Sequence, residues 1–83
     1  MSPRCPLVLA LLDAGPRRPH ELARALAGDY PAARTALHRL ERAGLVRRRA
    51  LAGGTDYLLT ARGRRELRLQ RSLWTRLALY HRD

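Results

Sequence analysis

Apolar positions recur every three or four residues between positions 29 and 44. This spacing is the period of an α-helix with one buried side. Asp29 can cap its start, Pro31 fits its first turn and Gly44 supplies a left-handed end. The apolar side consists of Ala33, Ala36, Leu37, Leu40 and Ala43. The opposite side carries Arg34, Thr35, His38 and Arg42, with Arg39 and Glu41 on the flanks.

Two shorter helices are predicted before this basic helix. Residues 7–12 are apolar on every side, which predicts a helix that is buried on several sides and ends at Gly15 and Pro16. Its start is placed near Pro3 or near Pro6. Residues 20–27 form the second helix, which a short turn with Gly28 joins to the basic helix. This order of helix, tight turn and helix is that of a helix-turn-helix.

After the basic helix, the period changes from 3.6 to about 2. Residues 45–51 are predicted as one strand, residues 52–54 as a turn and residues 55–59 as the returning strand. The first strand carries three consecutive arginines and the turn ends in two glycines: Arg47, Arg48, Arg49, Gly53 and Gly54. Arginines on a short hairpin can simply protect its edge. Directly after the basic helix, we favour a wing that contacts the DNA backbone.

Thr60 is expected to cap a last helix that continues to about His81. At ~1.5 Å per residue this helix is about 30 Å long, too long for the preceding body to cover. Its apolar side carries Gly63, Leu67, Gln70, Leu73, Trp74, Leu77, Tyr80 and His81. We therefore expect a homodimer whose interface uses Leu67, Leu73, Trp74, Leu77 and Tyr80, together with Leu7 and Leu11 of the first helix. The alternative is that the first helix folds back over this side within one chain.

These elements predict a mainly α fold with a two-stranded β-wing, namely a winged helix-turn-helix followed by a long dimerisation helix. Residues 1–59 would form the winged helix, and residues 60–83 the C-terminal helix. The chain has 83 residues, which fits one small domain with a thin core.

Charge is the strongest compositional feature. Seventeen arginines against seven acidic residues give a net charge of +10, which indicates a polyanionic partner. No apolar run is long enough to cross a membrane, and the single thiol, Cys5, cannot form an intramolecular disulfide. A cytoplasmic, nucleoid-associated protein is the expectation. Cys5 is predicted to be a small buried hydrophobe, with a redox-sensing thiol as the alternative.

The sequence offers no pattern typical of an enzyme or a metal centre. His20, His38 and His81 lie far apart, and no Cys/His spacing resembles a closed metal site. Ser2 and Ser72 have no nearby His and acid that would suggest a nucleophile. We expect a protein without catalytic residues, metal or cofactor.

Two sequence blocks carry a resemblance to known regulators. The block at positions 37–46 is LHRLERAGLV, and the block at positions 57–67 is YLLTARGRREL. They resemble the patterns L-x-x-L-E-x-x-G-L-V and Y-x-L-T-x-x-G-x-x-L of winged-helix transcription regulators of the PadR and MarR kinds, although Leu67 lies one position later than the last Leu of the second pattern. The PadR kind is taken as the closer one, because a single helix follows the wing. The resemblance implies dimerisation through the last helix, with the first helix often packed against that of the partner.

The resulting prediction is a small dimeric regulator, acting as a repressor, that binds specific sequences of double-stranded DNA. The basic helix would lie in the major groove, and the wing would contact the backbone or the minor groove. The expected DNA-binding residues are Arg17, Arg18, Tyr30, Arg34, Thr35, His38, Arg39, Arg42, Arg47, Arg48, Arg49, Gly53 and Gly54. Three alternatives remain open: a basic helix that is only solvated, a winged helix that binds RNA, and a protein-interaction module that uses the last helix.

Overall fold

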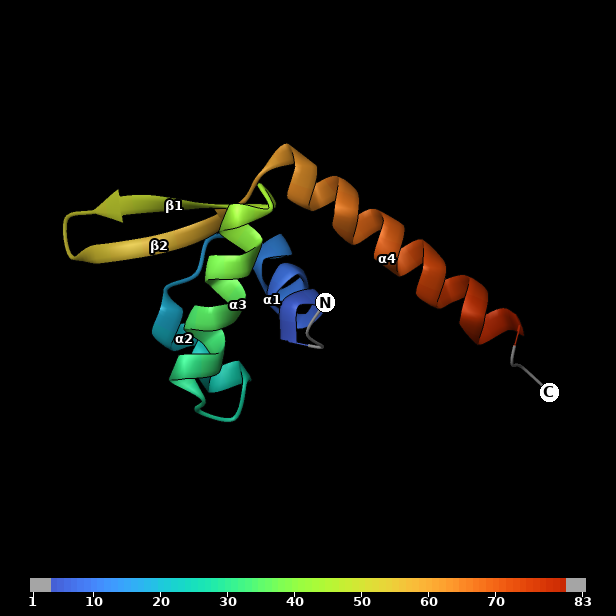
Figure 1. The fold of residues 1–83 in the computed structure, drawn as a ribbon, viewed down its shortest axis with the longest axis horizontal. Coiled ribbons are helices and arrows are strands. Elements are labelled where there is room, and N and C mark those ends of the chain that lie inside the picture. The colour runs from blue at the N-terminus through green and yellow to red at the C-terminus, as the bar shows by residue number, and fades with distance from the viewer. Residues whose placement is uncertain (1–3, 81–83) are drawn as a thin grey trace.

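The computed structural model describes residues 4–80, without the side chains at positions 4, 74 and 78–80. Three helices form a compact body, a two-stranded hairpin projects from one side of it, and a long helix leaves on the other side (Figure 1). The elements in order are α1 (Arg4–Asp13), α2 (Pro19–Ala25), α3 (Tyr30–Arg42), β1 (Val46–Leu51), β2 (Gly54–Leu59) and α4 (Ala61–Tyr80). The predicted fold class is confirmed.

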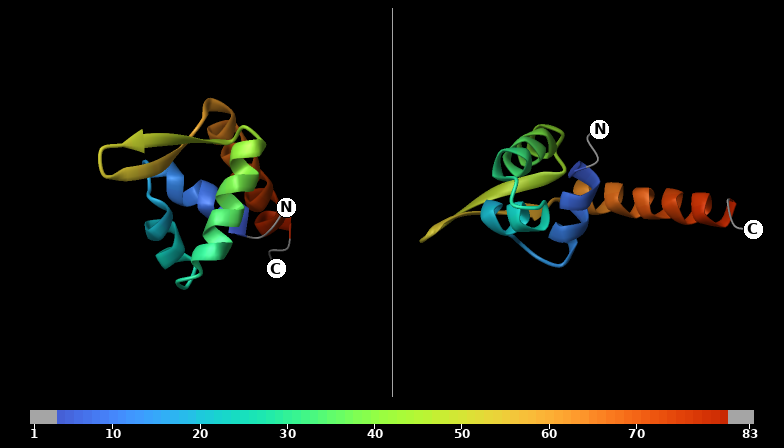
Figure 2. Two further views of the ribbon diagram at one scale, coloured as in Figure 1. Left: turned by 60° about the vertical axis from the view of Figure 1, so that its left-hand side comes forward. Right: turned by 90° about the horizontal axis from the view of Figure 1, so that it is seen from below.

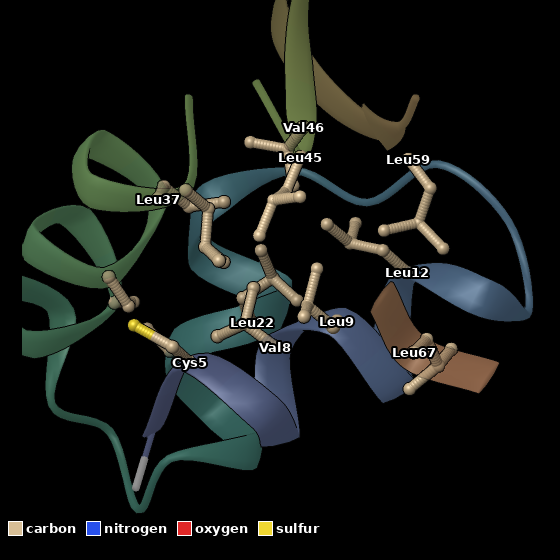
Figure 3. Packing of buried hydrophobic residues seen from close by; sticks show 14 residues of the cluster. Cys5, Val8, Leu9, Leu12, Leu22, Leu37, Leu45, Val46, Leu59 and Leu67 are labelled. Atoms are coloured by element: carbon tan, nitrogen blue, oxygen red, sulfur yellow. The ribbon is translucent and has the colours of Figure 1, made fainter. Parts of the chain in front are cut away.

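The core sits between α1, α3 and the base of the hairpin. The apolar run of α1 is its centre, with Val8 and Leu9 fully buried, and Leu37 of α3 packs against it (Figure 3). Cys5 is 1% exposed in this cluster, which agrees with its prediction as a buried hydrophobe. Leu7 is 43% exposed, so α1 is not covered on every side within one chain.

The turn between α2 and α3 comes earlier than the sequence indicated. α2 ends at Ala25, because Ala27 and Gly28 both adopt left-handed backbone conformations, with φ of 60° and 79°. The positive φ of Ala27 is uncommon for a residue with a side chain, and no sequence pattern announces it. Asp29 then caps α3 by accepting the Ala32 amide at 3.0 Å, as predicted.

The hairpin is antiparallel and pairs Val46 with Leu59 at its base and Leu51 with Gly54 at its tip. The turn is therefore two residues long, and Gly54 belongs to β2 rather than to the predicted turn. A third segment extends this sheet, because Arg17 and Tyr57 exchange two backbone hydrogen bonds of 3.0 and 2.8 Å. A single bridge has no side-chain periodicity, so the sequence did not predict it.

The start of α4 is fixed to the body by close backbone contacts. The Thr60 hydroxyl donates to the Gly44 carbonyl at 2.7 Å and accepts the Gly63 amide at 3.0 Å, which confirms the predicted cap. A Cβ on Gly63 would fall on the carbonyl oxygen of Leu45, so only glycine fits there. Leu67, one turn later, is 4% exposed.

Further along, α4 leaves the body and projects into solvent (Figure 2). Leu69, Leu73 and Leu77 are 60%, 57% and 40% exposed. One described ion pair ties this part to α1, between Arg71 Nη1 and Asp13 Oδ2 at 3.2 Å. Because α1 leaves Leu73 and Leu77 exposed, the fold-back alternative is wrong for these two residues. None of the helices in residues 4–80 has the length and apolarity needed to cross a membrane.

Candidate nucleic-acid interface

The outer face of α3 is a continuous basic surface. Its apolar side is buried against the core, which forces the polar side outward. No acidic residue contributes to this surface, and none of its members forms an ion pair with another described residue. We call it the α3 face; its residues are Arg34, Thr35, His38, Arg39 and Arg42.

Tyr30 begins α3 and stands one turn before Arg34. The Arg34 guanidinium carbon lies 5.9 Å from the centre of the Tyr30 ring, a cation–π distance. Tyr30 itself is 42% exposed, so its ring remains accessible to a ligand beside Arg34. This contact restricts the rotamers of Arg34 at the start of the α3 face.

An open cleft of about 330 Å³ separates α3 from the wing. The start of α2, the start of α3 and one side of the hairpin enclose it, and no carboxylate is among its lining residues. The lining residues are Arg18, Pro19, His20, Tyr30, Arg34, Arg48, Gly54, Thr55 and Tyr57. The structure thus brings together basic residues from three separate elements.

The three wing arginines occupy different environments, although the sequence suggested one cluster. Alternate residues of a strand point to opposite faces, so Arg48 lines the cleft while Arg47 lines the other side of the wing, beside Arg64. Arg48 also approaches Glu41 at 3.9 Å, a loose and exposed ion pair. Arg49 has a partner inside the wing.

Arg49 binds Asp56, its cross-strand partner. Arg49 Nε donates to Asp56 Oδ1 at 3.0 Å and Nη2 donates to Oδ2 at 2.7 Å. This guanidinium holds the pKa of the Asp56 carboxyl below its usual value. The pair therefore stabilises the wing above about pH 4, and that contribution is lost as the pH falls through the lowered pKa. Sequence reasoning missed Asp56; a register counted back from the two-residue turn would have placed it opposite Arg49.

Two arginines precede α2, and both lie next to the wing. Arg18 Nη1 donates to the Gly53 carbonyl at 3.0 Å, so the structure gives this predicted DNA-binding residue an intramolecular partner. The Arg17 side chain makes only a long hydrogen bond of 3.4 Å to the neighbouring Pro16 carbonyl. Arg17 is the more available of the two for an external anion.

The predicted dimer-interface residues also separate into groups. Leu67 is part of the single-chain core, and Leu11 packs partly against that core. The expectation that Leu67 lies uncovered is therefore corrected, because the body covers the first two turns of α4. Leu7, Leu73 and Leu77 are exposed, whereas the side chains of Trp74 and Tyr80 lie outside what the structure describes.

The described residues contain no group of three or more His, Cys, Asp or Glu side chains that could hold a metal ion. His38 belongs to the α3 face and His20 lines the cleft, while His81 lies outside the described residues.

Fold and basic surface together define a winged-helix protein of the kind found in transcription regulators. A family model described as "MarR family" matches residues 1–54. The chain therefore belongs to the MarR family. The MarR part of the sequence resemblance is confirmed, and these matches give no support to the PadR kind as the closer one. No curated protein sequence matches the chain.

Several solved structures share the fold over nearly the whole chain. A point mutant of MepR from S. aureus, bound to an oligodeoxyribonucleotide, aligns with a TM-score of 0.84 at 21% identity, covering 96% of this chain and 62% of that one. The reduced form of the transcriptional regulator YodB from B. subtilis aligns with a TM-score of 0.86 at 19% identity, covering 96% of this chain and 82% of the YodB chain. A possible transcriptional regulator for arsenical resistance aligns with a TM-score of 0.73 at 28% identity, covering 99% of this chain and 91% of that regulator. This chain thus spans less than two thirds of the MepR chain.

Proposed function

We propose that this protein is a regulator, acting as a repressor, that binds specific sequences of double-stranded DNA and has no enzymatic activity. The observation that carries the proposal is the α3 face, which presents three arginines without an acidic partner among the described residues. An α-helix fits the major groove, and arginine binds the O6 and N7 edge of guanine with two hydrogen bonds. The DNA-bound MepR structure is a relative of the same fold that holds an oligodeoxyribonucleotide.

The wing supplies the second part of the proposed contact. Arg47 and Arg48 lie on its two faces, and both are exposed. A hairpin beside a helix in the major groove meets the backbone or the minor groove, where arginines bind phosphate independently of sequence. Arg17, which lies outside the cleft beside Glu21 and Arg24, is proposed to add a further phosphate contact.

We also propose that the protein acts as a homodimer through Leu73 and Leu77 of α4 and Leu7 of α1. These leucines are exposed in the single chain, and covering them gains about 1.5–3 kcal/mol for each buried side chain. Two recognition helices related by a twofold axis contact half-sites about one DNA turn, ~34 Å, apart. The preferred site is then an inverted repeat.

Duplex DNA is favoured over single-stranded RNA by the aromatic content of the surface. Recognition of single strands uses exposed aromatic rings on which bases stack. Among the described side chains, Tyr30 is the exposed aromatic, while Tyr57 packs against the core.

The test begins with selection of bound sequences from random duplex DNA, followed by anisotropy titrations on the selected site. Arg34→Ala and Arg42→Ala should each weaken binding by about 1–3 kcal/mol and relax sequence preference. Arg76→Ala removes the same charge from the exposed side of α4 and serves as the matched control; it should leave sequence preference unchanged. Equal effects from all three substitutions would contradict specific recognition by α3.

Salt dependence provides an independent measurement. If six to ten phosphates are neutralised, affinity should fall roughly 10³–10⁵-fold between 50 and 200 mM salt. Duplex RNA, single-stranded RNA and heparin serve as competitors of the selected duplex in titrations at one salt concentration. A flat salt response, or tighter binding to RNA than to the selected duplex, would overturn the proposal.

A further inference from the structure

The outer half of the wing has little support from the core. Its base is held by Val46 and Leu59, which are both buried. Beyond Val46, every residue of β1 is exposed. A two-stranded hairpin is marginally stable by itself, so an unsupported tip would sample many orientations. Among the described residues, one long-range side-chain hydrogen bond reaches this tip.

That bond runs from Arg18 Nη1 to the Gly53 carbonyl, at 3.0 Å. Arg18 is well placed to hold the tip, because its own backbone is fixed on two sides. It caps the start of α2, with its amide donating to Glu21 Oε1 at 2.9 Å, and the preceding Arg17 is paired with Tyr57 in β2. The Arg18 side chain therefore connects α2 directly to the wing tip.

The two glycines of the tip leave room for this guanidinium. A Cβ on Gly54 would lie 3.2 Å from Arg18 Nη1, closer than most real contacts of a Cβ. Gly54 also has a φ of 145°, which side chains rarely adopt. A Cβ on Gly53 would lie 3.6 Å from Arg18 Nη2, an ordinary contact distance. Glycine at position 54 thus serves both the turn and the approach of Arg18.

Charge strengthens the same arrangement. Asp56 is 5% exposed and already binds Arg49, and its carboxylate also attracts Arg18. Arg49 is the main cause of the lowered pKa of Asp56, and the charge of Arg18 lowers that pKa further to a smaller extent. Removing Arg18 would leave the hairpin tied to the body at its base, through the backbone of Arg17 and through the loose Arg48–Glu41 pair, and would remove the described side-chain hydrogen bond that reaches the tip.

We propose that Arg18 is a positioning residue, which holds the wing tip through the Gly53 carbonyl and so sets where the wing meets a ligand bound on the α3 face. This assigns to Arg18 a role different from the direct contact with DNA expected from the sequence. The consequence for DNA rests on the proposed function, whereas the ordering of the tip does not.

The first experiment measures the order of the tip in the free protein by ¹⁵N relaxation. The amides of Ala52, Gly53 and Gly54 should have order parameters near 0.85 in the wild type and below about 0.6 in Arg18→Gln. Arg17→Gln is the matched control, because it removes the same charge one residue earlier and keeps the backbone pairing with Tyr57. It should leave the tip ordered.

If Arg18→Gln does not fold, Arg18→Met replaces it, because methionine keeps an unbranched apolar stem but cannot donate a hydrogen bond to the Gly53 carbonyl. Its order parameters at the tip should also lie below those of the wild type. Unchanged order in the Arg18 variant, or an equal loss of order in Arg17→Gln, would overturn the positioning role.

The second experiment separates positioning from direct contact by a double-mutant cycle on DNA affinity. If Arg18 acts through the wing, Arg48→Ala should lower DNA affinity by a smaller factor in the Arg18→Gln background than in the wild type. The two factors should differ more than about threefold. If Arg18 binds its own phosphate, the affinity loss of the double variant should equal the product of the two single-variant losses within about twofold, and the proposal fails. In the control cycle, which combines Arg17→Gln with Arg48→Ala, the affinity loss of the double variant should equal the product of the two single losses. Should no variant bind DNA at any salt concentration, the proposed function fails, and the relaxation data still decide the role of Arg18.

Discussion

The two ends of α4 show how one apolar stripe can serve two different purposes. We call residues 61–67 the anchored turns and residues 68–77 the outer turns. The anchored turns carry Gly63 against a backbone carbonyl and Leu67 in the core. The outer turns carry Leu73 and Leu77 on the continuing stripe, 57% and 40% exposed.

The contrast between the anchored and the outer turns shows that periodicity identifies the side of a helix that becomes buried, but not the surface that buries it. In the anchored turns the covering surface is the chain's own body. In the outer turns the described residues of one chain leave Leu73 and Leu77 exposed, and the proposed cover for these two side chains is a second copy. Four predictions test this division, in order of decreasing effect.

The largest effect is expected when charge is placed on the outer turns. Leu73→Glu combined with Leu77→Glu should convert the proposed dimer into a folded monomer, because each leucine contributes about 1.5–3 kcal/mol when buried. Sedimentation velocity at tens of micromolar measures the change, and circular dichroism should show that the helix content is retained. A wild-type monomer at that concentration would contradict the division and the expected symmetry of the DNA site.

The second prediction concerns the last core residue of α4. Leu67→Ala should lower the free energy of unfolding by about 2–5 kcal/mol, because it leaves a cavity in a closed core. Leu69→Ala is the control, since Leu69 is 60% exposed, and it should stay within about 0.5 kcal/mol. Urea unfolding in the monomeric double-glutamate background avoids a dependence on protein concentration. Similar losses of unfolding free energy for Leu67→Ala and Leu69→Ala would contradict a division between anchored and outer turns at Leu67.

A smaller loss is expected at Gly63. Helix propensity alone predicts that Gly63→Ala stabilises α4 by about 1 kcal/mol. The added Cβ would meet the Leu45 backbone carbonyl, however, and overpacking against backbone costs about 3 kcal/mol, the upper end of the usual range. We expect a net destabilisation in thermal unfolding. A stabilised variant would show that α4 can move away from the body at no cost.

The smallest effect concerns the cap. Thr60→Ala removes a side chain that joins the Gly44 carbonyl to the Gly63 amide, and it should cost about 0.5–2 kcal/mol. Thr60→Ser keeps the hydroxyl and should recover most of this loss. Hydrogen exchange at the Gly63 amide reports the cap directly, and unchanged protection in Thr60→Ala would mean that the anchored turns do not depend on it.

The proposed DNA-binding surface was predictable to different degrees in its two parts. The α3 face follows from local sequence, because a 3.6-residue period fixes which side chains share a face once the apolar side is buried. The wing does not follow as directly. Arg47, Arg48 and Arg49 are adjacent in sequence, yet strand alternation sends Arg48 into the cleft and the register gives Arg49 to Asp56. Register depends on the turn, and its length was predicted one residue too long.

Linear sequence patterns were sufficient to predict the order of elements, the caps at Asp29 and Thr60, the left-handed end at Gly44 and the net charge of the chain. These features are local or additive, so a linear pattern contains them. Three features could be seen only in the folded chain: Arg18 contacts the wing tip, Arg17 extends the sheet, and the core ends at Leu67. Each of these depends on the distance between segments far apart in the chain. That distance is set by packing, because the buried side chains of α1, α3 and the hairpin fix how the elements approach one another.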